Sequence, residues 1–124
     1  MKCLLDTNVL LWYVAGDSRL PEIIRDTIDR PESAIYVSTA PLWEIAIKYS
    51  IKRLELKPDL NTFLNKYVLN GCFQMLPIEV RHALRVAELP FHHRDPFDRL
   101  LISQSQIEGL KLLYTDSTFD LYMT

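Results

Sequence analysis

The sequence predicts an α/β fold: a parallel sheet of four to five short strands flanked by helices, in a single domain of residues 1–124. Four short apolar segments, at residues 2–5, 35–38, 73–76 and 112–115, alternate with longer segments whose apolar residues recur at helical spacing. Strands that alternate with helices form parallel sheets covered on both faces. A chain of 124 residues suits one such core and leaves no room for a second.

The composition is that of a soluble globular protein, with 48% hydrophobic and 24% charged residues. The net charge of −2 argues against a protein that coats nucleic acid, but not against an enzyme that holds phosphates through metal ions. Cys3 and Cys72 match no metal-ligand spacing, so we expect reduced cytoplasmic thiols. Because neither a signal peptide nor a membrane-spanning run is evident, we expect a complete cytoplasmic protein that is not bound to a membrane.

The N-terminal segment is expected to form one strand and two helices. Residues 2–5 predict a short buried strand that ends at Asp6, and the apolar run 9–15 predicts a helix. Pro21 suits the first turn of a second helix. One face of that helix would carry three isoleucines: Ile23, Ile24 and Ile28.

A second strand and a third helix are expected next. Residues 31–33 break the helical pattern, and residues 35–38 are strand-like. Ser38 and Thr39 are candidate caps for a helix over residues 41–52.

Two further helices enclose the third strand. Asp59 can cap the first of them and Asn70-Gly71 can end it. Its apolar residues recur at helical spacing: Leu60, Phe63, Leu64, Tyr67 and Val68. Residues 73–76 form the third strand candidate. The helix after it would carry four apolar residues: Val80, Ala83, Leu84 and Ala87.

The clearest helix signal follows. Asp95 is a candidate cap, Pro96 suits the first helical position, and Asp98 falls in the first turn. Gly109 is a natural end for this helix, and residues 112–115 form the fourth strand.

Four acidic residues are expected at one edge of this sheet: Asp6, Glu44, Asp98 and Asp116. In open parallel sheets the functional crevice lies beyond the carboxyl ends of the strands. Asp6 and Asp116 follow predicted strand ends, whereas Glu44 and Asp98 fall in the opening turns of helices. Acids in these four places can converge on one crevice.

Each acid taken alone has a structural alternative. Asp6 could cap the helix that follows it, and its spacing supports a cap and a ligand equally. Glu44 could pair with Lys48 across one helical turn, although its apolar neighbours favour a functional role. Asp116 could be a turn residue, and Asp98 could complement the helix dipole.

The chemistry of four converging carboxylates points to a metal ion. Clustered carboxylates repel one another and raise each other's pKa unless a cation lies between them. Ligands that are all oxygen suit Mg²⁺ or Mn²⁺ rather than zinc. Such ions activate a bound water, orient a phosphodiester and stabilise the leaving oxygen. The arrangement therefore predicts hydrolysis of a phosphodiester without a covalent nucleophile.

Four segments in order resemble the PIN-domain family, and within it the VapC-type toxins of bacterial toxin–antitoxin pairs. They are residues 4–8 (Leu-Leu-Asp-Thr-Asn), the 38–48 stretch with Leu-Trp-Glu-Ile-Ala-Ile-Lys, residues 95–102 (Asp-Pro-Phe-Asp-Arg-Leu-Leu-Ile), and Thr115-Asp116 with Phe119 after it. The resemblance covers essentially the whole chain. The motifs are specific in combination, and any one of them alone is weak.

The resemblance implies a single PIN-like domain and a metal-dependent endoribonuclease, the toxin of a VapBC-type system, that hydrolyses RNA with a metal-activated water. It makes four acids both catalytic and metal-binding: Asp6, Glu44, Asp98 and Asp116. Asn8 and Thr115 would be polar supports of the site. It also implies Mg²⁺ or Mn²⁺ as the cofactor, single-stranded or looped RNA as the substrate, a homodimer, and inhibition by a small VapB-like antitoxin.

Basic residues and histidines near the acids have more than one interpretation. Arg94 and Arg99 are candidate phosphate contacts, with surface salt bridges as the alternative. His92 and His93 could bind metal or phosphate, but a solvated loop is favoured. Asp95 is favoured as a helix cap rather than a ligand. The one dense basic stretch holds four residues: Lys48, Lys52, Arg53 and Lys57.

Two other functions are compatible with an α/β domain that carries clustered acids. The first is a catalytically inactive PIN-like module that binds or scaffolds a partner. Retention of all four acids argues against it, because a degenerate site usually loses one. The second is a response-regulator receiver, which would need paired acids after the first strand and a lysine after a late strand. Here Thr7-Asn8 follows Asp6 instead, so the receiver fits poorly.

Overall fold

A four-stranded parallel sheet with the strand order β3-β2-β1-β4 lies at the centre of the computed structural model, which describes residues 1–56, 59–71 and 73–123. The strands are β1 Lys2–Leu5, β2 Ala34–Ser38, β3 Gln74–Leu76 and β4 Lys111–Leu113. This confirms the predicted α/β fold, with four strands. Cys3 is a buried free thiol in β1, whereas Cys72 and Lys57 lie outside the described residues.

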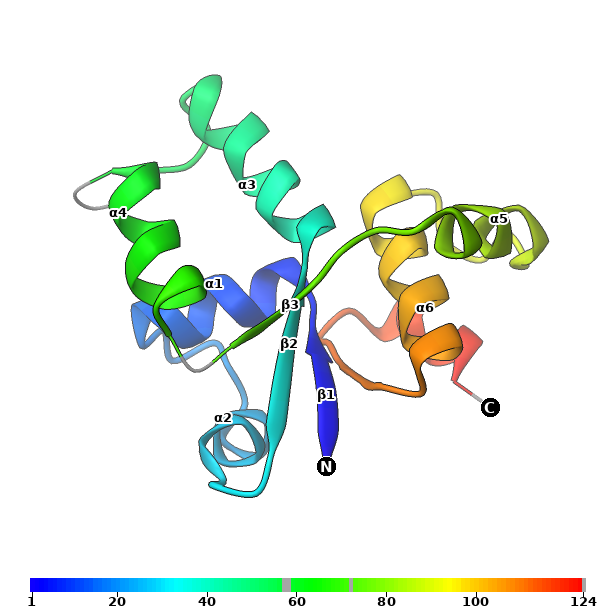
Figure 1. Ribbon diagram of the computed structural model, residues 1–124, viewed down its shortest axis with the longest axis horizontal. Helices are drawn as coiled ribbons and strands as arrows, with labels where there is room; N and C mark the ends of the chain where they lie inside the picture. The colour runs from blue at the N-terminus through cyan, green and yellow to red at the C-terminus, as the bar shows by residue number, and fades with distance from the viewer. Residues whose placement is uncertain (57–58, 72, 124) are drawn as a thin grey trace.

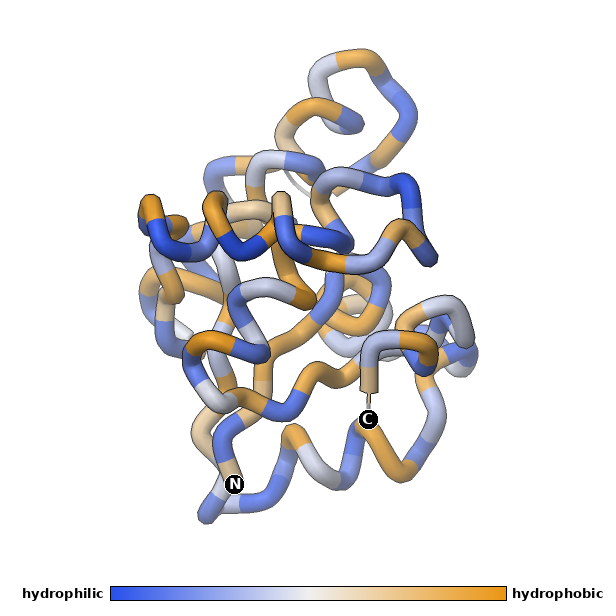
Figure 2. Tube along the Cα trace, turned by 90° about the vertical axis from the view of Figure 1, so that its right-hand side faces the viewer, coloured by the Kyte–Doolittle hydropathy of each residue, from blue (hydrophilic) through white to orange (hydrophobic). Residues whose placement is uncertain are grey.

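Helices cover both faces of the sheet, as predicted. They are α1 Thr7–Ala15, α2 Glu22–Asp29, α3 Thr39–Ser50, α4 Leu60–Leu64, α5 Val80–Glu88 and α6 Pro96–Glu108, together with the π-helical turn η1 Asn65–Leu69 and the 3₁₀ helix η2 Ser117–Tyr122. In Figure 1, α1, α2 and α4 lie to the left of β1 and β2, and α5 and α6 lie to their right. Blue and orange alternate along most helices in Figure 2, as expected for helices with one buried face.

The two faces of the sheet form two separate cores, because successive strand residues point to opposite sides. Cys3 and Leu5 pack in one core with apolar residues of α1–α4: Val9, Leu10, Ile28, Ile45 and Phe63. Leu4 packs in the other core with residues of α6 and η2: Leu101, Ile102, Phe119 and Tyr122. No helix in the described part of the chain is long and apolar enough to cross a bilayer.

The caps that begin and end the helices agree with the sequence. Ser38 Oγ accepts from the Ala40 amide (3.1 Å) at the start of α3. Asp59 Oδ1 accepts from the Thr62 amide (2.8 Å) at the start of α4. Gly109 ends α6 with a φ of 66°, a left-handed conformation that favours glycine.

The segment after Asp59 is less regular than the continuous helix that was expected. It divides into α4 and the single π-helical turn η1, and Asn70 follows. The backbone at Gly71 passes close to the preceding turn, and a Cβ atom there would lie 2.5 Å from the Tyr67 carbonyl oxygen. Only glycine fits that exit, which is consistent with the predicted stop.

The helix α5 is present as predicted, but its apolar residues do not form its buried face. Val80 and Leu84 are 76% and 64% exposed, whereas His82 is fully buried. The reason is that α5 docks on α6 through polar contacts rather than through its apolar stripe. Ser103 Oγ donates to the His82 carbonyl oxygen (2.6 Å), and His82 Nε2 lies 2.8 Å from Glu108 Oε2. Ile23 on α2 is likewise exposed rather than buried.

Candidate functional site

A polar cavity of about 170 Å³ opens at the carboxyl edge of the sheet. Nine residues line it: Asp6, Thr7, Asn8, Glu44, Lys48, Asp95, Asp98, Asp116 and Phe119. The structure therefore brings together the four acids that the sequence singled out. The parallel strands explain this meeting, because β1 and β4 end side by side, and the Asp6 amide donates to the Leu113 carbonyl oxygen (3.1 Å).

Asp6 lies at the floor of this cavity and is only 4% exposed. Its Oδ1 accepts from the Val9 amide (2.7 Å) and so caps α1, and the Thr115 amide also donates to the carboxylate. Burial raises the pKa of Asp6 to about 6, and the nearby charges of Glu44 and Asp116 add to the increase. The side chain thus caps a helix and also faces the cavity.

Glu44 extends into the cavity from α3. Thr7 Oγ1 donates to its Oε1 (2.7 Å), and Lys48 Nζ lies 2.9 Å from its Oε2. The ion pair with Lys48 across one helical turn is therefore present, and it lies inside the cavity rather than on a solvated stripe. Glu44 is held at both oxygens.

Asp98 lies in the first turn of α6, directly above the cap that Asp95 makes. Asp95 Oδ1 accepts from the amides of Phe97 (2.8 Å) and Asp98 (3.2 Å), as predicted for a helix cap. Burial raises the pKa of Asp98 to about 7, and Asp95, Asp6 and Glu44 raise it further, while His93 opposes them.

Asp95→Ala should destabilise the protein by about 1 kcal/mol, because two amides of α6 lose their acceptor. Asp95→Asn keeps an oxygen acceptor and should unfold close to the wild type in urea. Asp95→Ala should also retain the RNA cleavage that the sequence resemblance implies. If Asp95→Asn abolishes cleavage and Asp98→Asn spares it, the structural and catalytic roles of the two residues are reversed.

Asp116 closes the cavity from the segment after β4, with a side chain that is 50% exposed. Its Oδ1 accepts from the Thr118 amide (2.9 Å) and caps η2. These bonds to Thr118, together with His93, hold the pKa of Asp116 below its usual range. Asp116 is thus a carboxylate at neutral pH, next to the buried Asp6 and the half-buried Asp98, whose pKa values are raised.

This donor set fits a hard divalent cation. The facing groups are carboxylate oxygens, which suit Mg²⁺ or Mn²⁺, and two of the carboxyls resist ionisation as like charges in a partly buried site do. Among the described residues, no three of these four acids bring oxygens within 4.8 Å of one another. Mutual repulsion favours that spacing, and a cation would relieve it.

A second group that could hold a metal ion lies between α5 and α6: Glu79, His82 and Glu108. His82 Nδ1 accepts from the Glu79 amide (2.9 Å), so the ring proton is on Nε2, which faces Glu108 Oε2. A metal ion at Nε2 would have to displace that proton. Arg81 already pairs with both glutamates. We therefore assign this group to the docking of α5 rather than to the cavity.

The supporting residues named from the sequence divide into three cases. Asn8 lines the cavity, and Thr115 contributes its amide to Asp6. Arg94 is exposed in the loop before α6, and its contact with phosphate stays a prediction. Arg99, in contrast, is only 5% exposed, and its guanidinium donates to the carbonyl oxygens of Val86 (2.9 Å) and Pro90 (3.1 Å). These contacts of Arg99 stabilise the loop before α6, and the buried guanidinium is not placed to bind phosphate.

The sequence offered His93 only as a less favoured contact to metal or phosphate, and the structure brings its ring to the acids. The favoured solvated loop is not what the structure shows, because the amides of His92 and His93 both donate to Tyr122 Oη (3.0 and 2.9 Å). His92 is exposed, but the ring of His93 turns inward, and its Nε2 lies 3.0 Å from Asp98 Oδ2. The available signal was its place two residues before the Asp95 cap, and that place alone does not fix the direction of a ring.

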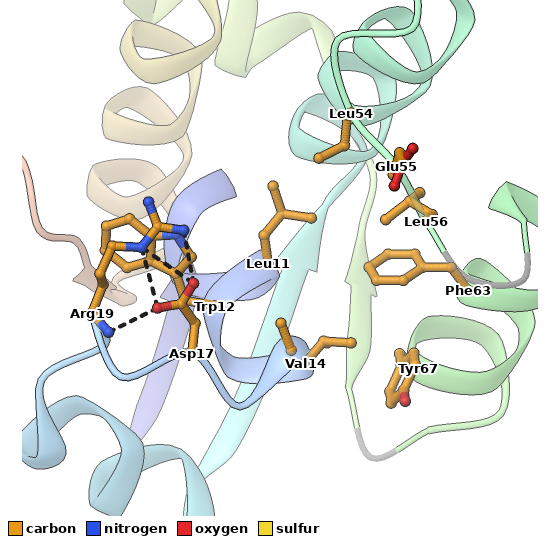
Figure 3. A pocket seen from close by; sticks show the side chains of 11 residues that line it. Leu11, Trp12, Val14, Asp17, Arg19, Leu54, Glu55, Leu56, Phe63 and Tyr67 are labelled. Carbon is orange, nitrogen blue, oxygen red and sulfur yellow. Dashed lines mark hydrogen bonds and ion pairs between the residues drawn. The ribbon is translucent and has the colours of Figure 1, made fainter.

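A larger, mostly apolar groove of about 390 Å³ lies away from the acids. Figure 3 shows Leu11 and Val14 of α1 facing Leu54 and Leu56 of the segment after α3, with further lining from α4 and η1: Phe63 and Tyr67. An ion pair between Asp17 and Arg19 (2.7 Å) closes one end. The groove thus offers a mainly apolar surface with charged side chains at its margin.

Comparison with known proteins identifies a family and a similar solved structure. A family model described as PIN domain matches residues 3–122. Among solved structures, the chain is similar to VapBC2 from Rickettsia felis bound to a DNA fragment from their promoter, with a TM-score of 0.72 and 15% identity. The match covers 98% of this chain and 93% of that chain. The search of curated proteins finds no match.

Proposed function

Since the chain belongs to the PIN-domain family of nucleases, we propose that it is a metal-dependent endoribonuclease, the toxin of a VapBC-type toxin–antitoxin pair. The observation that carries the proposal is the polar cavity at the carboxyl edge of the sheet, lined by the four acids. We take the domain to be the whole of residues 1–124 and place its activity in the cytoplasm.

In this proposal the four acids would hold Mg²⁺ or Mn²⁺, and the ion would supply an activated water and stabilise charge on the cleaved phosphodiester. Thr7 keeps Glu44 turned into the cavity. Lys48 neutralises Glu44 and lies where a phosphate oxygen of RNA would enter. Lys52 and Arg53 are exposed just beyond it, which supports a path for the RNA backbone past the end of α3.

The direct test is cleavage of a single-stranded RNA by the purified protein. We expect cleavage with Mg²⁺ or Mn²⁺, none in EDTA, and recovery when Mn²⁺ is restored. The products should be internal fragments rather than single nucleotides released from one end. Binding of Mn²⁺ and RNA without any cleavage would instead favour the inactive scaffold module.

A VapB-like antitoxin is the proposed protein partner, and the apolar groove is its proposed docking surface. The similar Rickettsia structure is a VapBC complex. The groove exposes apolar side chains, and a contiguous apolar surface of this kind is typical of a protein-binding site. The homodimer implied by the resemblance stays a prediction. One surface for it is formed by Trp43 and Ile47 of α3 and by Ile51, which caps the end of α3, and all three side chains are exposed.

Leu54→Glu should weaken binding of the small DNA-binding protein that we expect to be encoded beside this gene. Leu54 lines the groove, so a charge there would be desolvated by an apolar partner segment, and we expect at least about a tenfold loss of affinity. Leu84→Glu is the matched control, because Leu84 is exposed on α5, outside the lining of the groove. Calorimetry with both variants decides the matter. Equal weakening by both would place the partner elsewhere.

A further inference from the structure

The ring of His93 lies between two acids that come from different parts of the chain. Its Nε2 is 3.0 Å from Asp98 Oδ2, at the start of α6, and 3.5 Å from Asp116 Oδ2, in the segment after β4. The Nε2 atom is buried, and it makes no well-aligned hydrogen bond with either carboxylate. It therefore lies between the two carboxylates without being committed to either of them.

The other ring nitrogen decides which atom carries the proton. The Asp95 amide donates to His93 Nδ1 (3.1 Å), so Nδ1 must offer a lone pair. In the neutral ring the proton is then on Nε2, and this N–H faces Asp98 and Asp116. A metal ion at Nε2 would need this proton removed or the bond to the Asp95 amide broken. In this tautomer His93 can donate to the acids, and it offers no lone pair to a metal ion beside them.

The position of the His93 ring is also fixed by an aromatic contact and by the backbone of His93. It packs edge-to-face on Phe119 of η2, with ring centroids 5.6 Å apart. The amide of His93 is anchored by Tyr122 Oη, and the same η2 helix is capped by Asp116. The loop before α6 and the C-terminal segment are thus joined at this ring, so a shift of the ring would move Asp98 relative to Asp116.

We propose that His93 is a positioning residue whose Nε2–H bridges Asp98 and Asp116 and fixes their separation, so that the two carboxylates are preorganised to hold one divalent cation. This inference rests on the proposed function. Donors behind metal-binding side chains orient them, and their removal typically lowers metal affinity by about 10- to 100-fold. We therefore expect the metal affinity to depend on His93 even though His93 does not touch the ion.

Two amide substitutions separate the two nitrogens of the ring. In His93→Asn the side-chain oxygen can replace Nδ1 and accept from the Asp95 amide, but no atom reaches the acids. In His93→Gln the longer side chain places its NH₂ group near the position of Nε2. We expect Mn²⁺ titration by calorimetry, without RNA, to give at least about a tenfold weaker Kd for His93→Asn. His93→Gln should stay within about threefold of the wild type.

The outcomes distinguish this inference from the proposed function. If the wild type does not bind Mn²⁺ at all, the proposed function fails. If the wild type binds and both variants bind equally well, only the positioning role of His93 fails. If His93→Gln loses affinity and His93→Asn keeps it, His93 acts through the start of α6 and not through the acids.

A measurement on the unmodified protein covers the case in which a variant does not fold. Nitrogen-15 NMR of the metal-free wild type should show the His93 proton on Nε2, and addition of Mg²⁺ should leave that proton in place. A ring protonated on Nδ1 alone, or an Nε2 that loses its proton when Mg²⁺ binds, would overturn the proposal.

Discussion

Asp6→Asn is expected to lower the rate of RNA cleavage by about a thousandfold, equivalent to about 4 kcal/mol of lost transition-state stabilisation. The substitution removes a buried negative charge from the floor of the cavity. It keeps the shape of the side chain and an oxygen that can accept from the Val9 amide, so α1 stays capped. The loss should therefore appear in the chemical step, measured under single-turnover conditions, and not in the circular dichroism spectrum.

The matched control for this variant is Asp59→Asn. Asp59 also caps a helix through its Oδ1, but it is exposed and does not line the cavity. It should cleave RNA at the wild-type rate. Undiminished cleavage by Asp6→Asn would remove the assignment of the acids to catalysis. Equal losses in Asp6→Asn and Asp59→Asn would indicate that helix caps, and not charge in the cavity, account for the effect.

The sequence carried enough information to place the acids because their positions depend on backbone topology. Asp6 and Asp116 follow β1 and β4, and neighbouring parallel strands end at the same edge of the sheet. Glu44 and Asp98 lie near the starts of α3 and α6. The N-caps of these helices, Ser38 and Asp95, can be recognised from the local sequence. Both kinds of information are contained in short segments.

Side-chain directions that depend on tertiary contacts could not be predicted in this way. The apolar residues Val80 and Leu84 of α5 are exposed, because His82, Ser103 and Glu108 hold the opposite face of this helix against α6. The inward turn of His93 likewise depends on Tyr122, about thirty positions further along the chain. Charge and polarity alone suggested solvent exposure, and the contacts that reverse it are distant in sequence.

The free energy of unfolding should fall as pH rises in the metal-free protein. The Asp6 and Asp98 carboxyls stay protonated to a higher pH in the folded state than in the unfolded state. The pKa of Asp6 is raised to about 6 and that of Asp98 to about 7, both above their ordinary value of 3.8. Between about pH 4 and 7 the folded state therefore binds more protons than the unfolded state, and the free energy of unfolding decreases with pH. For Asp6 alone the loss is of the order of 3 kcal/mol. Asp116, whose pKa is lowered, acts in the opposite direction only below about pH 4.

Mg²⁺ should restore this stability, and more strongly at pH 8 than at pH 5, because protons compete with the cation for the same carboxylates. For a site with a Kd near ~1 mM, ~10 mM Mg²⁺ contributes roughly 1.4 kcal/mol and raises the Tm by several degrees. Asp98→Asn removes one of the repelling charges, so at pH 8 the metal-free variant should melt at or above the wild-type temperature and respond less to Mg²⁺. Thermal melts at both pH values and matched ionic strength, with Asp59→Asn as the control, measure all three effects. A wild type whose Tm ignores Mg²⁺ at pH 8, and an Asp98→Asn protein that is simply less stable, would mean that these acids serve the fold and hold no cation.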